Sequence, residues 1–459
     1  MKVSRSDVRC KAHAMPKLQF ENERLTSFAG LVVFQQFFSE IALKTRLTMC
    51  FRHLRQGKVF DRATIFLQLV VHLLLGFREL RDKQHYEDDP LVKRLLGLKR
   101  LPDVGTLSRA LKEADAKSIS NLRRLLREFV TDRLKASLLV RITLDFDGSV
   151  QSTGRCAEGT AVGFNKKKKG ARSYYPLFCT IAQTAQVFDF LHRSGNVHDS
   201  NGAAEFILSC IQRVRDAIPW GVHIEVRMDS AFFSDELVQA LEGEGVEFTI
   251  SVPFERFVEL KQMIEKRKRW KSVGADVSYF ESDWKPHSWN DRFRFLFIRT
   301  RSKKQRKGPV QLDLFVPYEY GYEFKVIVTN KTANVKTVVS YHEGRGAQEG
   351  IFAELKTNCH MDYVPVRRLL GNQLYLLAGL FAHNLSRELQ MATSPPCRAT
   401  NRKRATLWVF EKLSTLRSTI IQRAGRLTTP RRTLTLTISG NQWLKERILG
   451  ILSSLQAAG

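Results

Sequence analysis

Residues 139–148, Leu-Val-Arg-Ile-Thr-Leu-Asp-Phe-Asp-Gly, decide the fold of this chain. Apolar and polar residues alternate along them, which predicts a β-strand with one buried face. The apolar face carries Val140, Ile142, Leu144 and Phe146. The opposite face carries Arg141, Thr143, Asp145 and Asp147. Two carboxylates therefore lie on the same face near the end of the strand.

Further elements follow this strand in a regular order. The pattern predicts strands at 174–182 and 186–192, a helix at 200–217, a strand at 223–228, a helix at 234–241 and a strand at 246–252. A mixed α/β sheet results from this order when the crossovers are right-handed: three strands, then a helix, a strand, a helix and a strand. This is the element order of an RNase-H-like core, which is the predicted fold class.

Helical periodicity dominates before this core. Ala63–Phe77 is an apolar run suited to a buried helix, and Thr106 is the expected N-cap of a later one. Residues 254–335 interrupt the core with a charged helix and strand-like pieces at 293–299, 312–316 and 324–328. A long helical region then runs from Tyr341 to about Gln390.

We therefore predict five segments along the chain. They are a helical N-terminal domain at 1–135, the first part of the core at 136–253, a β-rich insertion at 254–335, the completion of the core at 336–392 and a basic C-terminal region at 393–459. Small basic helical domains often bind DNA, although a domain that only packs would show the same pattern.

The charge of the chain points to a polyanionic partner. Its 459 residues include 74 Lys and Arg against 46 Asp and Glu, a formal net charge of +28. Nucleic acid is the natural partner, because each phosphate neutralised by Lys or Arg releases counterions. A membrane surface would also attract such a chain. The positive charge can also have no binding role at all.

Neither a membrane anchor nor an export signal is evident in the sequence. The longest apolar run is shorter than the roughly 20 residues that span a bilayer, and the N-terminus lacks the apolar stretch of a signal peptide. Seven scattered cysteines with no Cys-x-x-Cys pair suit reduced thiols. We expect a cytoplasmic, nucleoid-associated protein with no membrane partner.

Acidic residues at the ends of two predicted strands are the first candidates for chemistry. Asp145 and Asp147 end the first strand, and Asp229 ends the strand at 223–228. Ligands gather at strand ends in open α/β sheets. Asp is also frequent in turns and helix caps, so each of these residues alone can equally be structural.

A third acidic residue lies in the helical stretch Tyr341–Lys356, YHEGRGAQEGIFAELK. At about 100° per residue, Arg345, Glu349 and Lys356 project from one face of such a helix. Tyr341 joins this face if the helix extends back through the two glycines. The alternative is a solvated face with intrahelical ion pairs.

Three carboxylates from separate elements suit phosphoryl transfer. Magnesium prefers carboxylate and water oxygens, and two such ions stabilise the attacking and leaving oxygens when a phosphodiester bond is cut. Nearby Arg and Lys side chains would hold phosphates. These residue types do not separate a hydrolase from a transferase.

In this order, the residues resemble the DDE transposases of bacterial insertion sequences, in the branch with a Tyr-Arg-Glu-Lys signature. Asp147-Gly148-Ser149 and Asp229-Ser230 match the first two motifs of that family. Arg345, Glu349 and Lys356 match Arg-x3-Glu-x6-Lys, whereas Tyr341 has three intervening residues instead of two. The segment GFNKKKKGARSYYPLF at 163–178 is also similar to a stretch of the family, and the resemblance covers roughly residues 85–390.

The resemblance implies an RNase-H-like core with a β-rich insertion before the Glu. It implies that Asp147, Asp229 and Glu349 are catalytic and bind Mg²⁺, with Mn²⁺ as a substitute and Asp145 as the alternative first ligand. It further implies cleavage at terminal inverted repeats and joining of 3′-ends to target DNA, by a homodimer bound to double-stranded DNA. Arg345, Lys356 and Tyr341 would contact that DNA.

Further candidates follow from the charge pattern and from the resemblance. A basic run can contact the DNA backbone or form a solvated loop; it comprises Lys166, Lys167, Lys168, Lys169 and Arg172. An aromatic residue of the insertion can stack on a flipped base if excision uses a hairpin, or it can be buried; the candidates are Trp270, Trp284 and Trp289. Two other functions stay open, namely an RNase-H-like nuclease without strand transfer and a catalytically silent DNA-binding protein.

Overall fold

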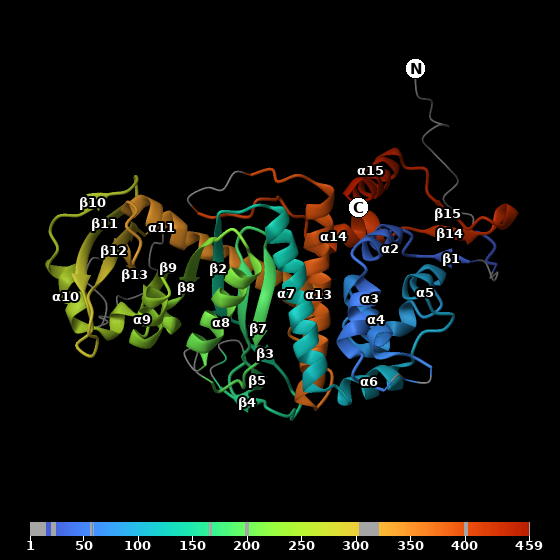
Figure 1. Ribbon diagram of the computed structural model, residues 1–459, viewed down its shortest axis with the longest axis horizontal. Helices are drawn as coiled ribbons and strands as arrows, with labels where there is room; N and C mark the ends of the chain where they lie inside the picture. The colour runs from blue at the N-terminus through green and yellow to red at the C-terminus, as the bar shows by residue number, and fades with distance from the viewer. Residues whose placement is uncertain are drawn as a thin grey trace, which may run out of the picture.

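The strand predicted at 139–147 is β2 (Arg141–Gly148), and it lies within a nine-stranded mixed sheet (Figure 1). The computed structural model describes residues 15–19, 24–55, 57, 59–163, 165, 168–197, 202–302, 321–398 and 403–458. The strands of the sheet, in spatial order, are β10 (Lys271–Ser272), β11 (Val277–Trp284), β12 (Phe293–Arg301), β13 (Tyr322–Thr329), β9 (Glu247–Val252), β8 (His223–Met228), β2, β6 (Leu177–Ile181) and β7 (Gln186–Leu191).

Five of these strands form the predicted core. β2 pairs antiparallel with β6 and parallel with β8, β6 pairs antiparallel with β7, and β8 pairs parallel with β9. The spatial order is therefore the third, second, first, fourth and fifth strand of the core. This is the arrangement of an RNase-H-like sheet, so the predicted fold class is confirmed.

The alternation in β2 sets which face is buried by helices. Ile142, Leu144 and Phe146 belong to the apolar cluster that also contains residues of α8 (Ala203–Ala217) and α9 (Asp235–Gly243). Val140, predicted on the same face, lies before the strand begins and is 77% exposed. The polar face of β2 points to the other side of the sheet.

The strands of residues 254–335 extend this same sheet. β13 pairs antiparallel with β9, and β12 and β11 follow it outward (Figure 1). The strands predicted near 293–299 and 324–328 are found as β12 and β13, whereas β11 was not predicted. The strand predicted at 312–316 lies outside the described residues.

The N-terminal region is helical, as predicted. Its helices are α2 (Leu31–Glu40), α3 (Leu43–Phe51), α4 (Arg62–Leu74), α5 (Pro90–Leu96), α6 (Val104–Lys112) and α7 (Ala116–Ala136). Every residue of α4 from Ala63 to Leu74 is buried, which confirms the core helix expected there. The predicted N-cap was wrong by three residues, because the carboxylate of Asp103 accepts the N–H of Thr106 at 2.6 Å and caps α6.

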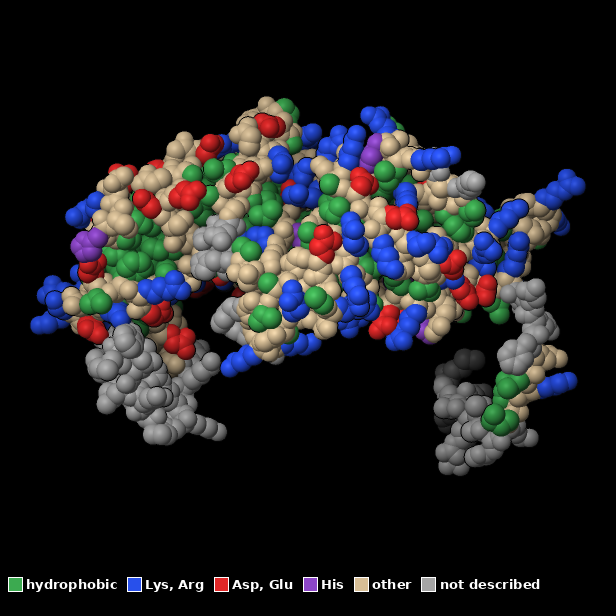
Figure 2. Space-filling view, turned by 90° about the horizontal axis from the view of Figure 1, so that it is seen from below, with side chains coloured by type: hydrophobic (Ala, Val, Ile, Leu, Met, Phe, Trp, Pro, Cys, Tyr) green, Lys and Arg blue, Asp and Glu red, His purple; other side chains and the backbone are tan. Residues whose placement is uncertain are grey.

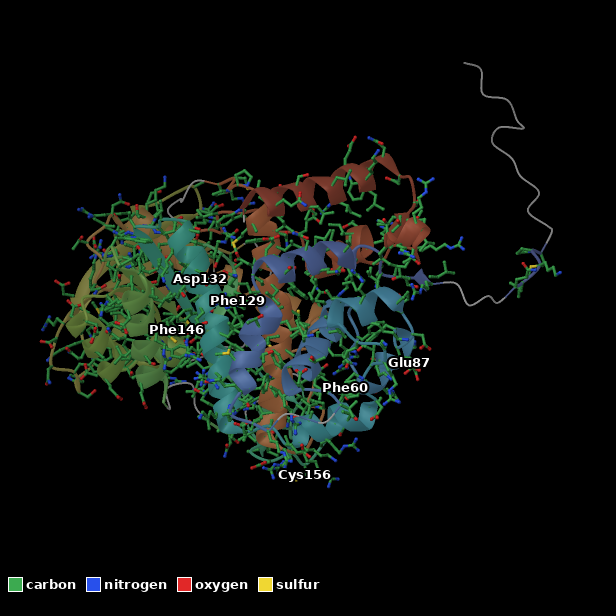
Figure 3. All side chains as sticks on the ribbon, turned by 45° about the vertical axis from the view of Figure 1, so that its right-hand side comes forward. Phe60, Glu87, Phe129, Asp132, Phe146 and Cys156 are labelled. Atoms are coloured by element: carbon green, nitrogen blue, oxygen red, sulfur yellow. The ribbon has the colours of Figure 1, made fainter. Side chains whose placement is uncertain are left out.

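Helix α7 connects these helices to the sheet. It packs beside α13 (Leu369–Thr393), between the N-terminal helices and the edge strand β7 (Figures 1 and 3). Phe129 on α7 contacts Phe381 on α13 with ring centroids 6.3 Å apart. Within the described residues, no helix has the length and apolar character needed to cross a membrane.

The helical region predicted from Tyr341 to Gln390 is broken into pieces. It consists of α11 (Val335–Glu343), the 3₁₀ turn η4 (Gly344–Gly346), α12 (Ala347–Asn358) and α13. A Cβ on Gly344 would lie 2.1 Å from the carbonyl oxygen of Lys403 and 2.2 Å from Nη1 of Arg227. The first position of η4 therefore requires glycine, because the Lys403 backbone and the Arg227 guanidinium leave no room for a side chain there.

The C-terminal region packs against the N-terminal helices. β14 (Gly425–Thr428) pairs with β15 (Thr435–Ile438) and with β1 (Leu25–Thr26), and α15 (Gln442–Ala458) contacts α2 (Figure 1). The predicted short strand near 433–438 is thus present. A third, small sheet follows β2 and contains β3 (Gln151–Ser152), β5 (Arg172–Tyr174) and β4 (Ala161–Val162).

Candidate active site

Two predicted aspartates lie at the C-terminal ends of neighbouring parallel strands. Asp145 of β2 is in register with Arg227 of β8, and Asp147 and Asp229 each follow two residues later. Equal offsets from a paired position on parallel strands place both carboxylates on the same face, at the same edge of the sheet. Both side chains are partly exposed.

The local backbone orients each of these carboxylates. Oδ1 of Asp147 accepts the N–H of Gly148 at 2.8 Å. A Cβ on Gly148 would lie 2.5 Å from the ring of Tyr175, so a larger residue after Asp147 would displace that ring. Asp229 caps the 3₁₀ turn η2 (Ser230–Phe232) and accepts the N–H of Ala231 at 2.9 Å. One oxygen of each carboxylate is therefore held by a main-chain donor.

Asp145, the alternative first ligand, is engaged in a buried ion pair. Nε and Nη2 of Arg227 donate to its two carboxylate oxygens at 2.5 and 2.6 Å. The side chains of Asp145 and Arg227 are 2% and 0% exposed. Burial raises the pKa of Asp145, and the guanidinium of Arg227 opposes that rise. Both oxygens of Asp145 are thus occupied by Arg227, whereas Asp147 stays partly exposed.

Together, Arg227 and Asp145 join three other segments to this edge of the sheet. Nη1 of Arg227 donates to the carbonyl of Tyr341 at 2.9 Å and to the carbonyl of Lys403 at 2.7 Å. Nε2 of Gln348, the residue before Glu349, donates to the main-chain oxygen of Asp145 at 2.9 Å. The pair Asp145–Arg227 therefore links β2, β8, α11, α12 and the C-terminal region directly beneath Asp147 and Asp229.

A second cluster of ion pairs lies two residues earlier on β8, further from the end of the strand. The buried carboxylate of Glu225 on β8 accepts from Arg141 at 2.9 Å, from Lys331 at 2.7 Å and from Nε of Arg404 at 2.9 Å. Burial alone would raise the pKa of Glu225, but the hydrogen bonds and charges of Arg404 and Lys331 lower it to about 2. The polar face of the two central strands is thus held by two stacked clusters of charge.

The structure brings Arg345 and Glu349 to the same edge. Arg345 lies in η4, and its Nη1 is 3.2 Å from Oδ2 of Asp147 while its Nη2 is 3.9 Å from Oε1 of Glu349. The side chain of Arg345 is 19% exposed and that of Glu349 is 71% exposed. Lys356 lies two turns further along α12 and is partly exposed. One guanidinium therefore stands between two of the predicted catalytic carboxylates.

Tyr341 is the predicted DNA contact that the structure places elsewhere. It lies on α11 and is 2% exposed, and η4 separates it from the face that carries Glu349. Its ring lies 5.1 Å from Cζ of Arg227 and 4.4 Å from Nζ of Lys331. Burial raises the pKa of its hydroxyl well above the usual value. Tyr341 packs against the ion pairs beneath the site and does not reach the surface.

The predicted basic run is only partly described. Lys166 and Lys167 lie outside the described residues, whereas Lys168 and Lys169 are exposed. Arg172 on β5 is exposed, and its Nε donates to the hydroxyl of Thr160 at 3.1 Å. The segment is thus anchored to the small sheet at Arg172, and two lysines beside this anchor face solvent.

The three tryptophans differ in exposure. Trp289 is 6% exposed and stacks on Phe233 with ring centroids 4.8 Å apart. Trp270 and Trp284 are half-buried. Cζ of Arg299 lies 4.5 Å from the ring of Trp270, and Nε1 of Trp284 donates to Glu259 at 3.2 Å. Trp289 is thus part of the apolar core, whereas the other two retain some accessible surface.

The donor set fits a hard divalent cation by chemical type. Asp147, Asp229 and Glu349 supply carboxylate oxygens, which Mg²⁺ prefers. In the part of the chain that the structure describes, no group of three or more His, Cys, Asp or Glu side chains is close enough to hold an ion. The three carboxylates would therefore have to come closer together to share an ion, and the guanidinium of Arg345 would have to move from between Asp147 and Glu349.

Arg227, Gln348 and Glu225 were not foreseen from the sequence. The sequence did contain one indication of the role of Arg227. This charged residue lies between the apolar residues Val226 and Met228, and the alternation of the strand places it on the same face as Asp229. A charged residue inside a central strand needs a partner, and Asp145 has the matching parity on β2. Gln348 carried no such signal, since its role depends on where α12 docks.

Positive charge gathers on the side toward which β2 runs. β2 leads downward in Figure 1 into the small sheet, and Figure 2 views the molecule from below. Lys and Arg side chains gather there over the middle of the molecule and over the part built from the N-terminal helices (Figure 2). Such a surface attracts a polyanion toward the edge that carries the carboxylates.

Comparison with known proteins gives one family and several distant structures. A family model described as "Transposase DDE domain group 1" matches residues 10–459. No curated protein is similar to the chain at a significant level. The piggyBac transposase, in a synaptic complex with hairpin DNA, is similar at 14% identity and a TM-score of 0.43, over 93% of this chain and 85% of that chain.

Two further structures are complexes of the Mos1 transposase. The paired-end complex with the left transposon end is similar at 10% identity and a TM-score of 0.17, over 42% of this chain and 60% of that chain. The mariner paired-end complex with Mn is similar at 11% identity and a TM-score of 0.17, over 43% and 60% of the two chains. The family model alone carries the family assignment.

Proposed function

Because this chain belongs to the group 1 family of transposases with a DDE domain, we propose that it cuts transposon-end DNA at terminal inverted repeats and joins the freed 3′-ends to target DNA. The observation that carries the proposal is the edge of the sheet where Asp147 and Asp229 end adjacent parallel strands and Arg345 ties Asp147 to Glu349. Carboxylates and a guanidinium at one edge are the groups that phosphoryl transfer needs.

In this proposal Asp147, Asp229 and Glu349 are the catalytic residues and hold Mg²⁺, with Mn²⁺ as a substitute. These three carboxylates would hold the divalent ions, which would supply positive charge for the attacking and leaving oxygens of the phosphodiester. The N–H groups of Gly148 and Ala231 keep the two aspartates oriented. Asp145 is assigned a positioning role instead, because both of its oxygens already accept from Arg227.

Cationic residues beside the carboxylates would hold the DNA. Arg345 can offer a bidentate fork to a phosphate, and Lys356 offers a point charge on the same helix. Lys168 and Lys169 would add backbone contacts from the small sheet, since both are exposed. If excision uses a hairpin, Trp270 and Trp284 are the stacking candidates, because Trp289 is buried against Phe233.

We further propose that the protein acts in the cytoplasm as a homodimer on double-stranded DNA, and that it belongs to the insertion-sequence branch with the Tyr-Arg-Glu-Lys signature. The match of Arg345, Glu349 and Lys356 to the last three signature positions supports the branch. The net charge of +28 supports the DNA partner.

The test is strand cleavage and joining on labelled DNA that carries the element's own ends. Wild type is compared with Glu349→Gln, in Mg²⁺ and in EDTA. The matched control is Glu265→Gln, which removes an exposed carboxylate from α10 (Val258–Lys266), far along the sheet at its outer end. We expect metal-dependent joining in wild type and control, and DNA binding without chemistry in Glu349→Gln.

The other outcomes identify the competing functions. Cleavage that leaves 3′-ends unjoined to a second duplex would indicate a nuclease. DNA binding without chemistry in wild type as well would indicate a silent DNA-binding protein. Joining that survives both EDTA and Glu349→Gln would refute the three-carboxylate mechanism.

A further inference from the structure

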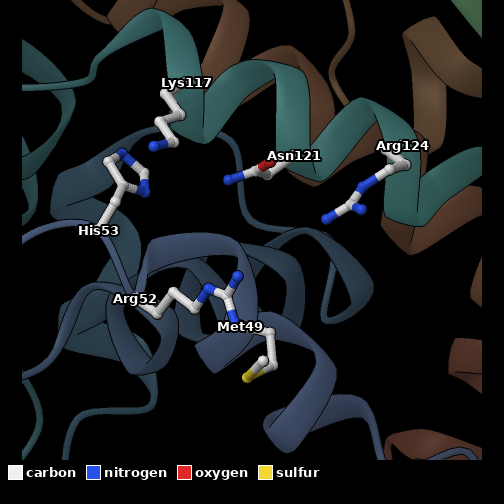
Figure 4. A pocket seen from close by; sticks show the side chains of 6 residues that line it. All are labelled: Met49, Arg52, His53, Lys117, Asn121 and Arg124. Carbon is white, nitrogen blue, oxygen red and sulfur yellow. The ribbon is translucent and has the colours of Figure 1, made fainter.

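A basic cleft lies between helices α3 and α7, away from the carboxylates. Its volume is about 270 Å³. Figure 4 shows Lys117, Asn121 and Arg124 on the first three turns of α7, opposite Met49 of α3 and the two residues that follow that helix, Arg52 and His53. The lining residues are Met49, Arg52, His53, Lys117, Asn121 and Arg124. Three of these six are permanently cationic, and none is acidic.

The cations of this cleft differ from the other arginines of α7. Arg123 and Arg127 both pair with the buried carboxylate of Asp189, at 2.8 and 2.7 Å. By contrast, Arg52 and Lys117 are exposed and have no acidic partner among the described residues. α7 thus neutralises the cations on its sheet-facing side and leaves charge on the side that faces the cleft.

The acidic groups near the cleft are already engaged. Asp115 is 2.9 Å from Nε2 of His53 and also caps the N-terminus of α7 by accepting the N–H of Ser118. Glu128 pairs with Arg46 at 3.2 Å and stands 3.8 Å from Arg124, whose side chain remains 63% exposed. Positive charge in the cleft therefore exceeds the local negative charge.

The cleft is also pre-formed. Nδ2 of Asn121 donates to the carbonyl of Cys50 at 2.9 Å, which pins α7 to the end of α3. Met49, 50% exposed, adds an apolar surface beside the cations. The volume is below the roughly 300–1,000 Å³ of pockets for drug-sized ligands, so it suits a small polyanionic unit with an apolar part. A phosphate and its deoxyribose have this chemistry.

We propose that this cleft binds the phosphate backbone of duplex DNA, at a place separate from the DNA that reacts at Asp147, Asp229 and Glu349. The proposal rests on the proposed function, since it assigns a second contact with the same partner. Arg52 and Lys117 would each neutralise one phosphate, and Met49 would lie against a sugar. Backbone contacts position a duplex without reading its sequence, so the cleft holds DNA in register and does not select the ends.

The test is DNA binding by the full chain in the absence of divalent metal, at a series of salt concentrations. Arg52→Gln combined with Lys117→Gln is compared with Lys268→Gln combined with Lys445→Gln, which removes two exposed lysines elsewhere. Each phosphate contact contributes about 0.9 to the slope of log K against log salt. We expect the cleft variant to lose about 1–2 units of slope, and up to about 60-fold in affinity at 0.1 M salt, equally for end DNA and unrelated DNA.

Five results would contradict these expectations. An unchanged slope, or the same loss in the control variant, would overturn the proposal. A loss confined to end DNA would overturn it as well, because the cleft would then read sequence. A further contrary result combines two measurements. Millimolar inorganic phosphate would raise the melting temperature of wild type but not that of the cleft variant, and the cleft variant would still bind DNA normally. The proposal would then be overturned, because the ligand of the cleft would be a free anion. Wild type that fails to bind any DNA would instead overturn the proposed function itself.

Discussion

The buried pair between Asp145 and Arg227 allows the sharpest prediction about stability and activity together. Replacing Arg227 by Met leaves the carboxylate of Asp145 buried without its partner, which typically costs about 3–5 kcal/mol. The same change removes the donor of the carbonyls of Tyr341 and Lys403, at about 1 kcal/mol each. The expected loss in free energy of unfolding is therefore about 5–7 kcal/mol.

This loss approaches the whole stability of many domains, which is about 5–15 kcal/mol. Arg227→Lys is therefore the informative partner variant, since it keeps the charge and one donor but loses the bidentate fork. We expect it to fold, with a loss between zero and that of Arg227→Met. Its cleavage rate should fall, because Asp147 and Asp229 follow the paired residues by only two positions.

The assay is urea unfolding followed by tryptophan fluorescence, with single-turnover cleavage on the same preparations. DNA affinity serves as the readout that a positioning role should leave unchanged, because Arg227 is 0% exposed and cannot touch DNA. Unfolding free energies of Arg227→Met within about 1 kcal/mol of wild type would refute the reasoning. So would a cleavage rate of Arg227→Lys equal to that of wild type.

Three further predictions concern neighbouring groups. The pKa of Glu225 in the folded state, about 2, lies below its ordinary 4.5, so its carboxylate stabilises the fold above pH 4.5 and loses this contribution as the pH falls toward 2. Glu225→Gln should remove about 2 kcal/mol of that acid dependence between pH 5 and 3, measured by urea unfolding, and an unchanged pH dependence would contradict this. Gly344→Ala should cost about 1–3 kcal/mol and slow cleavage, since its Cβ would collide with the Lys403 carbonyl; an unchanged melting temperature would contradict this. Glu349→Gln, by contrast, should change the free energy of unfolding by less than about 0.5 kcal/mol, because the side chain is 71% exposed, and a larger change would show a structural role.

The strand order of the core could be predicted from the sequence because it depends on local periodicity. β2 alternates over eight residues, and its apolar face, which packs against the helices, follows from Ile142, Leu144 and Phe146. The position of Asp147 and Asp229 at strand ends follows from the same pattern. The joining of the insertion to the core sheet could not be predicted, because β13 pairs with β9 across 70 or more residues and periodicity does not record the partner.

The extent of the helix around Glu349 was wrong for a physical reason. Helical spacing placed Tyr341 and Glu349 on one face, but this required a continuous helix through Gly344. The structure instead has the 3₁₀ turn η4 at Gly344–Gly346, and its tighter winding changes the direction in which the residues on either side project. Tyr341 consequently turns toward Arg227 and Lys331, and the face that carries Glu349 begins only at Arg345.

The basic C-terminal stretch shows why charge alone did not identify the residues that position the site. Lys403 and Arg404 belong to the predicted basic C-terminal region, yet the Lys403 carbonyl accepts from Arg227 and the Arg404 guanidinium donates to Glu225. These contacts span 176 and 179 residues of chain. A carboxylate buried in a central strand indicates that a cationic side chain must pair with it, because an unpaired buried charge is strongly destabilising. Glu225 and Asp145 are such carboxylates, but the sequence does not show which of the 74 Lys and Arg residues pairs with each of them. The edge that carries Asp147, Asp229 and Glu349 is therefore predictable as a set of carboxylates, whereas the long-range partners that hold it in place are seen only in the folded chain.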